Sequence, residues 1–221
     1  MEKVNWGVMG TSGIANAQTI PGMIKASNCR LYAIAGRDQD KVLDFQQRFG
    51  FEKAYFRYED LLEDPEVEAV YIPLPNSLHY TWAEKAMKSG KHVLCEKPLV
   101  PTAREAEKLF AVAEKNHVIL MEAFAYLHSP LIKAIKDEIE GGTIGEILYM
   151  ESQFITSDYD LSNIRMRRET FGGCTYDLGC YNTSMIQWMT GREPDSIKAM
   201  GAFHRRVLMC SPARSSPIVA V

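Results

Sequence analysis

A glycine-containing segment near the N-terminus has the composition of a phosphate-binding loop. It reads Gly10-Thr11-Ser12-Gly13-Ile14-Ala15 and stands between an apolar run and a stretch with helical spacing. In that setting a turn presents backbone N–H groups to a pyrophosphate at a helix N-terminus. Gly10 permits the tight turn and Ala15 allows close helix packing, but Ser12 stands where the dinucleotide-binding pattern has its second glycine.

A cation follows the next apolar run. Residues 31–35 are followed by Gly36, Arg37 and Asp38. An acidic residue alone at this point favours the free 2′-hydroxyl of NAD, whereas an arginine favours the 2′-phosphate of NADP. Asp38 also fits the N-cap of the following helix, and Arg37 has the alternative of being a solvated loop cation. The pair predicts NADP(H), with NAD as the second choice.

Lys97 stands in the sequence Cys95-Glu96-Lys97-Pro98, directly after another β-rich run. A lysine ammonium there can bind a substrate hydroxyl or act as a general acid/base if its surroundings lower its pKa. Pro98 restricts Lys97 to extended geometry. Taken alone, Lys97 is also explained as a surface lysine.

The elements that would position these residues alternate along the first 122 residues. β-rich runs occupy residues 4–9, 31–35, 69–72, 92–95 and 118–121. Stretches with helical spacing occupy residues 14–26, 38–49, 77–89 and 102–115. This alternation predicts an α/β, doubly wound parallel sheet with ligands beyond the carboxyl ends of its strands. Residues 1–122 are therefore predicted to be a dinucleotide-binding Rossmann domain.

The pattern changes after Glu122. Helices are expected at residues 130–140 and 175–189, and strands at 146–155 and 196–203. Residues 123–204 thus predict an α+β substrate and oligomerisation domain with an open sheet that is incomplete. Residues 205–221 have no period over their whole length and are interpreted as an atypical tail.

Composition excludes several classes of partner and site. The net charge of −3 argues against nucleic acid or an anionic membrane, and no run resembles a signal or membrane span. The five cysteines are odd in number and lack C-x-x-C spacing. A disulfide framework or metal site is therefore not expected, and a cytoplasmic protein is predicted.

The ordered series of motifs resembles the Gfo/Idh/MocA oxidoreductases. The motifs lie at residues 6–11, 35–38, 72–79, 96–99, 121–124 and 177–181. Within that family the chain is similar to the branch of trans-dihydrobenzenediol dehydrogenases and NADP-dependent sugar dehydrogenases. The resemblance is lost at Arg205, and family members run longer, which favours a truncated or altered C-terminal part.

The resemblance implies roles for residues that match the family motifs. Those matching the segment that lines the cofactor are Leu74, Pro75, Asn76 and His79. Glu96 and Lys97 match the Glu-Lys-Pro motif, whose lysine lies beside nicotinamide and substrate. Asp177 and Tyr181 match a motif of the second domain, and their four-residue separation places them on one helix face.

The resemblance also implies an activity, which is hydride transfer between NADP(H) and a hydroxyl or carbonyl carbon of a sugar, polyol or cyclic diol. Lys97 or Tyr181 would be the acid/base, and Asp177 would orient the substrate or keep Lys97 charged. A homo-oligomer through the second-domain sheet is expected if that sheet is complete enough. The alternative is a non-catalytic NADP-binding regulator or an inactive truncated remnant.

Overall fold

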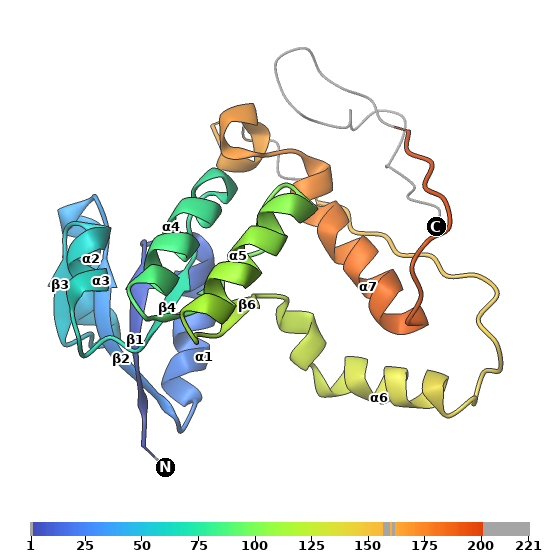
Figure 1. Cartoon of the computed structure of the whole chain (residues 1–221), viewed down its shortest axis with the longest axis horizontal. Coiled ribbons are helices and arrows are strands. Elements are labelled where there is room, and N and C mark those ends of the chain that lie inside the picture. The colour runs from blue at the N-terminus through green and yellow to red at the C-terminus, as the bar shows by residue number, and fades with distance from the viewer. Residues whose placement is uncertain (1, 157–159, 161, 201–221) are drawn as a thin grey trace. The chain divides into compact units, whose positions relative to one another are not determined.

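The computed structural model describes residues 2–156, 160 and 162–200. The chain forms two compact units, unit 1 (Met1–Ala123) and unit 2 (Phe124–Val221), which are described separately below (Figure 1). The predicted tail at 205–221 lies outside the described residues.

Unit 1 is built on a six-stranded sheet in the order β3-β2-β1-β4-β5-β6. The strands are β1 (Val4–Met9), β2 (Cys29–Ala35), β3 (Lys53–Tyr55), β4 (Ala69–Ile72), β5 (His92–Cys95) and β6 (Leu120–Glu122). Each neighbouring pair is parallel. The chain adds strands on one side of β1 and then returns to add β4 on the other, which is the dinucleotide-binding order. The α/β prediction is confirmed.

Helices cover both faces of this sheet. They are the π-helix η1 (Ala15–Thr19), α1 (Ile20–Lys25), α2 (Gln39–Phe49), α3 (Tyr58–Glu63), α4 (Asn76–Lys88) and α5 (Ala103–Lys115). Because side chains alternate across a strand, Tyr71 is buried with residues of η1, α1 and α2, whereas its neighbours Val70 and Ile72 are buried with residues of α3, α4 and α5. The sheet therefore separates two apolar cores.

Local capping explains the bounds of α2. The Asp38 side chain accepts a hydrogen bond from the Lys41 N–H at 3.2 Å, and Gly50 ends the helix with φ 75°. The cap at Asp38 is the one predicted from its residue type, and glycine at position 50 accepts the left-handed conformation that ends the helix.

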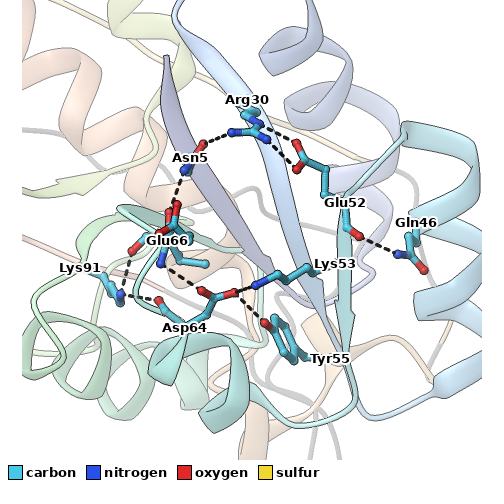
Figure 2. Close-up of polar contacts among 10 residues, drawn as sticks. Asn5, Arg30, Gln46, Glu52, Lys53, Tyr55, Asp64, Glu66 and Lys91 are labelled. Carbon is cyan, nitrogen blue, oxygen red and sulfur yellow. Dashed lines mark hydrogen bonds and ion pairs between the residues drawn. The ribbon is translucent and has the colours of Figure 1, made fainter. Parts of the chain in front are cut away.

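A polar network crosses the amino ends of the strands (Figure 2). The Asp64 carboxylate accepts hydrogen bonds from Lys53 Nζ at 2.8 Å and Tyr55 Oη at 2.6 Å, and the nearly buried Lys91 donates to the Asp64 and Val67 carbonyls. Burial raises the pKa of Asp64, but these donors outweigh it and hold the pKa below its ordinary value. The polar groups at this edge are thus engaged with one another.

The regular elements of unit 2 are all helices over its described residues. It contains η2 (Ala125–His128), α6 (Pro130–Glu140), η3 (Ile164–Met166), η4 (Arg168–Thr170), the π-helix η5 (Thr175–Gly179) and α7 (Cys180–Thr190). The two predicted helices are confirmed.

The two strands predicted in unit 2 are wrong over the described residues. Residues 146–155 form no strand, and residues 196–200 contain a single isolated bridge at Lys198; residues 201–203 lie outside the description. Alternation of apolar and polar residues does not by itself produce a strand, because a strand also needs neighbouring strands to pair with its backbone N–H and C=O groups. Leu148 and Tyr149 are accordingly 88% and 78% exposed.

Candidate functional site

The segments predicted to bind a ligand follow the carboxyl ends of neighbouring strands in unit 1. We define the ligand edge as residues 10–15, 36–37, 73–76 and 96–98, which follow β1, β2, β4 and β5. Two backbone hydrogen bonds connect them to neighbouring strands, from Gly10 N to Ala35 O at 2.7 Å and from Glu96 N to Ile72 O at 3.1 Å. In an open parallel sheet, this edge at the reversal of strand order is where ligands bind.

Gly10 occupies a position that favours glycine for two reasons, its backbone conformation and the space around it. Its φ is +119°, which L side chains rarely adopt, and a Cβ at this position would lie 3.0 Å from Leu74 Cδ2. The glycine loop and the segment after β4 are therefore in direct contact.

Ser12 acts as the cap of the helix that leaves the loop. Its Oγ accepts a hydrogen bond from Ala15 N at 3.2 Å, and its carbonyl accepts one from Asn16 N at 3.0 Å. The first N–H groups of a helix have no partner within the helix, so those of Gly13 and Ile14 are suited to an anion. Gly13 is exposed, whereas Ala15 is fully buried against the sheet. Although Ser12 stands in place of the second glycine, the N-terminus of the helix after the loop remains open to solvent.

Arg37 is exposed at the end of β2 and lies beside the Tyr58 hydroxyl. Burial raises the pKa of Tyr58, while the charge and hydrogen bond of Arg37 lower it. A Cβ on Gly10 would lie 4.0 Å from the same hydroxyl, so Arg37, Tyr58 and the glycine loop are neighbours. Tyr58 also has an edge-on contact with the Trp82 ring.

The Glu96-Lys97-Pro98 turn is held on either side of Lys97. Tyr71 Oη donates to Glu96 Oε1 at 2.5 Å, and Leu99 N donates to Glu122 Oε1 at 2.7 Å. Burial raises the pKa of Glu122, opposed by the Leu99 N–H and the charge of Lys97. Lys97 itself is partly exposed, and its positive charge acts on the Glu122 carboxylate.

His79 lies behind this turn with no exposed surface. Its Nδ1 lies 2.8 Å from the Pro98 carbonyl oxygen and its Nε2 lies 2.8 Å from that of Leu74. Burial lowers the pKa of His79, although both carbonyls and the charge of Glu96 act in the opposite direction. The ring therefore reaches the ligand edge through two backbone groups, one on each of the segments that follow β4 and β5.

In unit 2, Asp177 and Tyr181 lie on either side of the change from η5 to α7. Arg165 Nε donates to Asp177 Oδ1 at 3.0 Å. The Tyr181 ring lies 5.4 Å from the rings of Phe124 and Phe154, centroid to centroid. The contact between Arg165 and Asp177 could not be predicted from the sequence. The two residues are twelve positions apart and are joined by irregular backbone, so no periodic pattern relates them.

No other feature of the described residues is a better candidate for a ligand site than the ligand edge. A depression of about 590 Å³ lies at the amino edge of the sheet, but Asn5, Arg30 and Glu66 in its lining are bonded within the network of Figure 2. The described part of the chain contains no group of three His, Cys, Asp or Glu placed to hold a metal. It also contains no helix of the length and apolarity that a membrane span needs.

Two family models match the chain. One, described as an oxidoreductase family with an NAD-binding Rossmann fold, matches residues 4–124. The other, described as a GFO/IDH/MocA C-terminal domain, matches residues 132–214. Together they cover both units.

Similar curated proteins include three reductases or dehydrogenases. The dTDP-3,4-didehydro-2,6-dideoxy-alpha-D-glucose 3-reductase of Actinomadura kijaniata is 39% identical over 79% of this chain and 52% of its own. The D-xylose 1-dehydrogenase (NADP(+)) 2 of Haloferax volcanii is 38% identical over 88% of this chain and 59% of its own. The trans-1,2-dihydrobenzene-1,2-diol dehydrogenase of Xenopus laevis is 31% identical over 90% of this chain and 61% of its own.

A similar solved structure is KijD10, a 3-ketoreductase from Actinomadura kijaniata in complex with NADP and TDP-benzene. It aligns with a TM-score of 0.82 and 34% identity over 90% of this chain and 60% of that chain. The present chain thus spans between half and two thirds of the length of these relatives.

Proposed function

This chain belongs to the Gfo/Idh/MocA oxidoreductase family, and from that premise we propose that its ligand edge binds NADP(H) for hydride transfer. The acceptor or donor would be a hydroxyl- or carbonyl-bearing carbon of a sugar, polyol or cyclic diol. The observation that carries the proposal is the placement of the glycine loop and the Glu96-Lys97-Pro98 turn at one edge of one parallel sheet.

The residues at this edge fit the parts of a dinucleotide. The 10–15 loop, consisting of Gly10, Thr11, Ser12, Gly13, Ile14 and Ala15, leads into a helix whose first N–H groups, those of Gly13 and Ile14, suit a pyrophosphate. Arg37 would bind the 2′-phosphate, which its planar fork can hold by two hydrogen bonds. Leu74, Pro75 and Asn76 would line the side of the cofactor, with His79 supporting them from the core.

The nicotinamide ring supplies or accepts the hydride when the cofactor is bound. The chain's own residues hold the substrate and move a proton at its oxygen. We propose Lys97 as the group that binds the substrate oxygen and exchanges its proton, with the Tyr181 hydroxyl as the alternative acid/base. Asp177, held by Arg165, would orient the substrate. Glu96 would keep Lys97 charged until the proton is needed.

The printed names of the relatives support the choice of cofactor and substrate class. The Haloferax volcanii relative is named as using NADP(+), and KijD10 holds NADP. The relatives' substrates are named as a pentose, a dihydrodiol and a keto sugar nucleotide. All of them carry the secondary alcohol or ketone that this chemistry needs.

We also propose a cytoplasmic protein that self-associates through unit 2. Cys29 and Cys95 are free thiols, which is typical of a reducing compartment. Several large apolar side chains of unit 2 are exposed, including Leu131, Leu148 and Ile155. A second copy of the chain would cover them.

Replacement of Lys97 tests the proposed activity. The full chain would be assayed with NADP⁺ or NADPH against D-xylose, trans-dihydrobenzenediol and a dTDP-linked keto sugar. Lys97→Met should abolish turnover and leave the NADPH Kd within about threefold, because the ammonium acts on the substrate rather than on the pyrophosphate. Lys88→Met, on the exposed end of α4 where Lys88 pairs with Glu84, is the matched control and should retain turnover.

Retention of near-normal turnover by Lys97→Met would remove Lys97 from the mechanism. Saturable NADPH binding by the wild type with no turnover of any substrate would instead favour the non-catalytic NADP-binding protein.

A further inference from the structure

Tyr71 places a hydroxyl inside an otherwise apolar strand. It belongs to Ala69-Val70-Tyr71-Ile72, all four residues are buried, and Tyr71 has no exposed surface. A buried hydroxyl is costly unless it finds hydrogen-bond partners. Tyr71 finds two, since Thr19 Oγ1 lies 2.9 Å from its Oη and Glu96 Oε1 lies 2.5 Å from it.

The direction of this hydrogen-bond chain follows from the number of protons. The Tyr71 hydroxyl has one proton and donates it to the Glu96 carboxylate, so Thr19 must be the donor in its contact with Tyr71. Burial, and then the negative charge of Glu96, raise the pKa of Tyr71 far above its ordinary value. The hydroxyl therefore stays protonated and remains a donor to Glu96 across the working pH range.

The chain of contacts joins two parts of the ligand edge that are distant in sequence. Thr19 is the last residue of η1, in the helix that begins at the glycine loop, and Glu96 directly precedes Lys97. After Lys97, His79 lies against the Pro98 carbonyl and Glu122 accepts from Leu99 N, and before it the Glu96 N–H donates to the Ile72 carbonyl at 3.1 Å. Tyr71 adds a side-chain hydrogen bond that fixes the Glu96 carboxylate.

We propose that Tyr71 is a positioning residue for the proposed reaction, fixing the Glu96 carboxylate to the phosphate-loop helix so that Lys97 is presented in one orientation. The inference rests on the proposed function, because Lys97 is taken to be the group that acts on the substrate. Tyr71 touches neither cofactor nor substrate in this account and acts through Glu96 alone.

Tyr71→Phe removes the hydroxyl and keeps the ring. It should lower kcat about tenfold and leave the substrate KM and the NADPH Kd within about twofold, because a displaced acid/base mainly weakens the chemical step. Amide hydrogen exchange of peptides covering residues 96–99 in the unliganded chain should become faster. The pH profile of kcat should also change, since Glu96 would no longer be held beside Lys97.

Tyr55→Phe is the matched control. It removes the same kind of contact, a tyrosine hydroxyl donating to a carboxylate, but at the Asp64 network rather than at the ligand edge. It should lower stability by a similar amount while leaving kcat and the exchange of residues 96–99 unchanged. Thr19→Ser, which keeps the hydroxyl, should preserve kcat, whereas Thr19→Val should lower it.

A double-mutant cycle tests whether Tyr71 acts through Glu96. Tyr71→Phe should have no further effect on kcat in a Glu96→Ala background, because its partner is already gone. The inference would be overturned if the losses in kcat from the two substitutions were additive. It would also be overturned if Tyr71→Phe matched Tyr55→Phe in kcat and in hydrogen exchange of residues 96–99. Neither result would affect the proposed function. Failure of the wild type to bind NADPH would refute the proposed function, while the exchange comparison would still decide whether Tyr71 holds the turn.

Discussion

At the residue scale, the ligand edge combines accessible groups with buried groups that hold them. Arg37 and Lys97 could be predicted because each directly follows a β-rich run, and parallel sheets bind ligands where strands end. Tyr71 could not, because it stands within an apolar run and its hydroxyl is directed by Thr19 and Glu96, which are far from it in sequence. Sequence position therefore indicates which residues lie at the carboxyl ends of strands, and it does not indicate which residues hold them there.

Arg37→Ala tests the choice between the two dinucleotides. The NADPH Kd should rise by at least about tenfold, because a charge-assisted hydrogen bond to the 2′-phosphate contributes about 1.5–3 kcal/mol. The NADH Kd should stay within about twofold, since NADH lacks that phosphate. Arg30→Ala, at the amino end of the same strand where Arg30 pairs with Glu52, should change neither value. Equal weakening of NADPH and NADH by Arg37→Ala would contradict the assignment.

His79 should make stability depend on pH. Because the pKa of His79 is lowered in the folded chain, the unfolded chain takes up a proton first as pH falls below about 6.5. The stability that His79 contributes is therefore complete above that pH and is lost as pH falls from there towards its lower folded pKa. Urea denaturation at pH 7.5 and 5.5 should show a smaller difference between wild type and His79→Gln at pH 5.5.

The comparison with His79→Gln cancels other groups that titrate nearby, including Glu122, whose raised pKa has the opposite effect. An unchanged stability difference at pH 5.5 would contradict the lowered pKa of His79, and a larger difference would show that the two carbonyls hold the ring as a cation.

At the element scale, helices and strands could be predicted from the sequence where the local residue pattern agrees with the packing in the folded chain. The strands 4–9, 69–72 and 92–95 have the predicted bounds, because β-rich runs there end at glycine, proline or charged residues. β3 and α3 were missed because they span three and six residues, too few for a period to be recognised. The prediction of a strand at 146–155 failed for the opposite reason, since its clear alternation has no strand to pair with among the described residues of unit 2.

Gly10→Ala tests the close approach at the end of β1. It should lower the free energy of unfolding by about 2 kcal/mol, because φ +119° is strained for alanine and its Cβ would crowd Leu74. Gly22→Ala is the contrasting variant, since Gly22 lies in α1 with no atom within 4 Å of an added Cβ. It should raise stability by about 0.5–1 kcal/mol. Urea midpoints measure both, and a Gly10→Ala chain as stable as Gly22→Ala would refute the geometry.

At the scale of the whole molecule, the proposed cofactor site and the proposed partner surface lie in different units. The residues assigned to NADP(H) all belong to unit 1, which the family model for the Rossmann fold covers. Asp177 and Tyr181 belong to unit 2, and so do Leu131, Leu148 and Ile155, the exposed apolar side chains proposed for self-association. Cofactor binding and self-association can therefore be tested separately.

Light scattering at increasing concentration tests self-association. The wild type should associate, because Leu148 and its apolar neighbours in unit 2 are exposed. Leu148→Lys should reduce association by introducing a charge that a second copy would have to bury. Ile119→Lys, at a side chain of unit 1 that is 66% exposed, is the control and should behave as the wild type. A monomer at every concentration would contradict the proposed oligomer.

The central claim is that the ligand edge of unit 1 binds NADP(H), and the most direct test is titration of the full chain with NADPH followed by nicotinamide fluorescence. We predict saturable binding of one NADPH per chain, a rise in Tm with NADPH concentration, and weaker binding of NADH. Absence of saturation and of any rise in Tm with either dinucleotide would contradict the account.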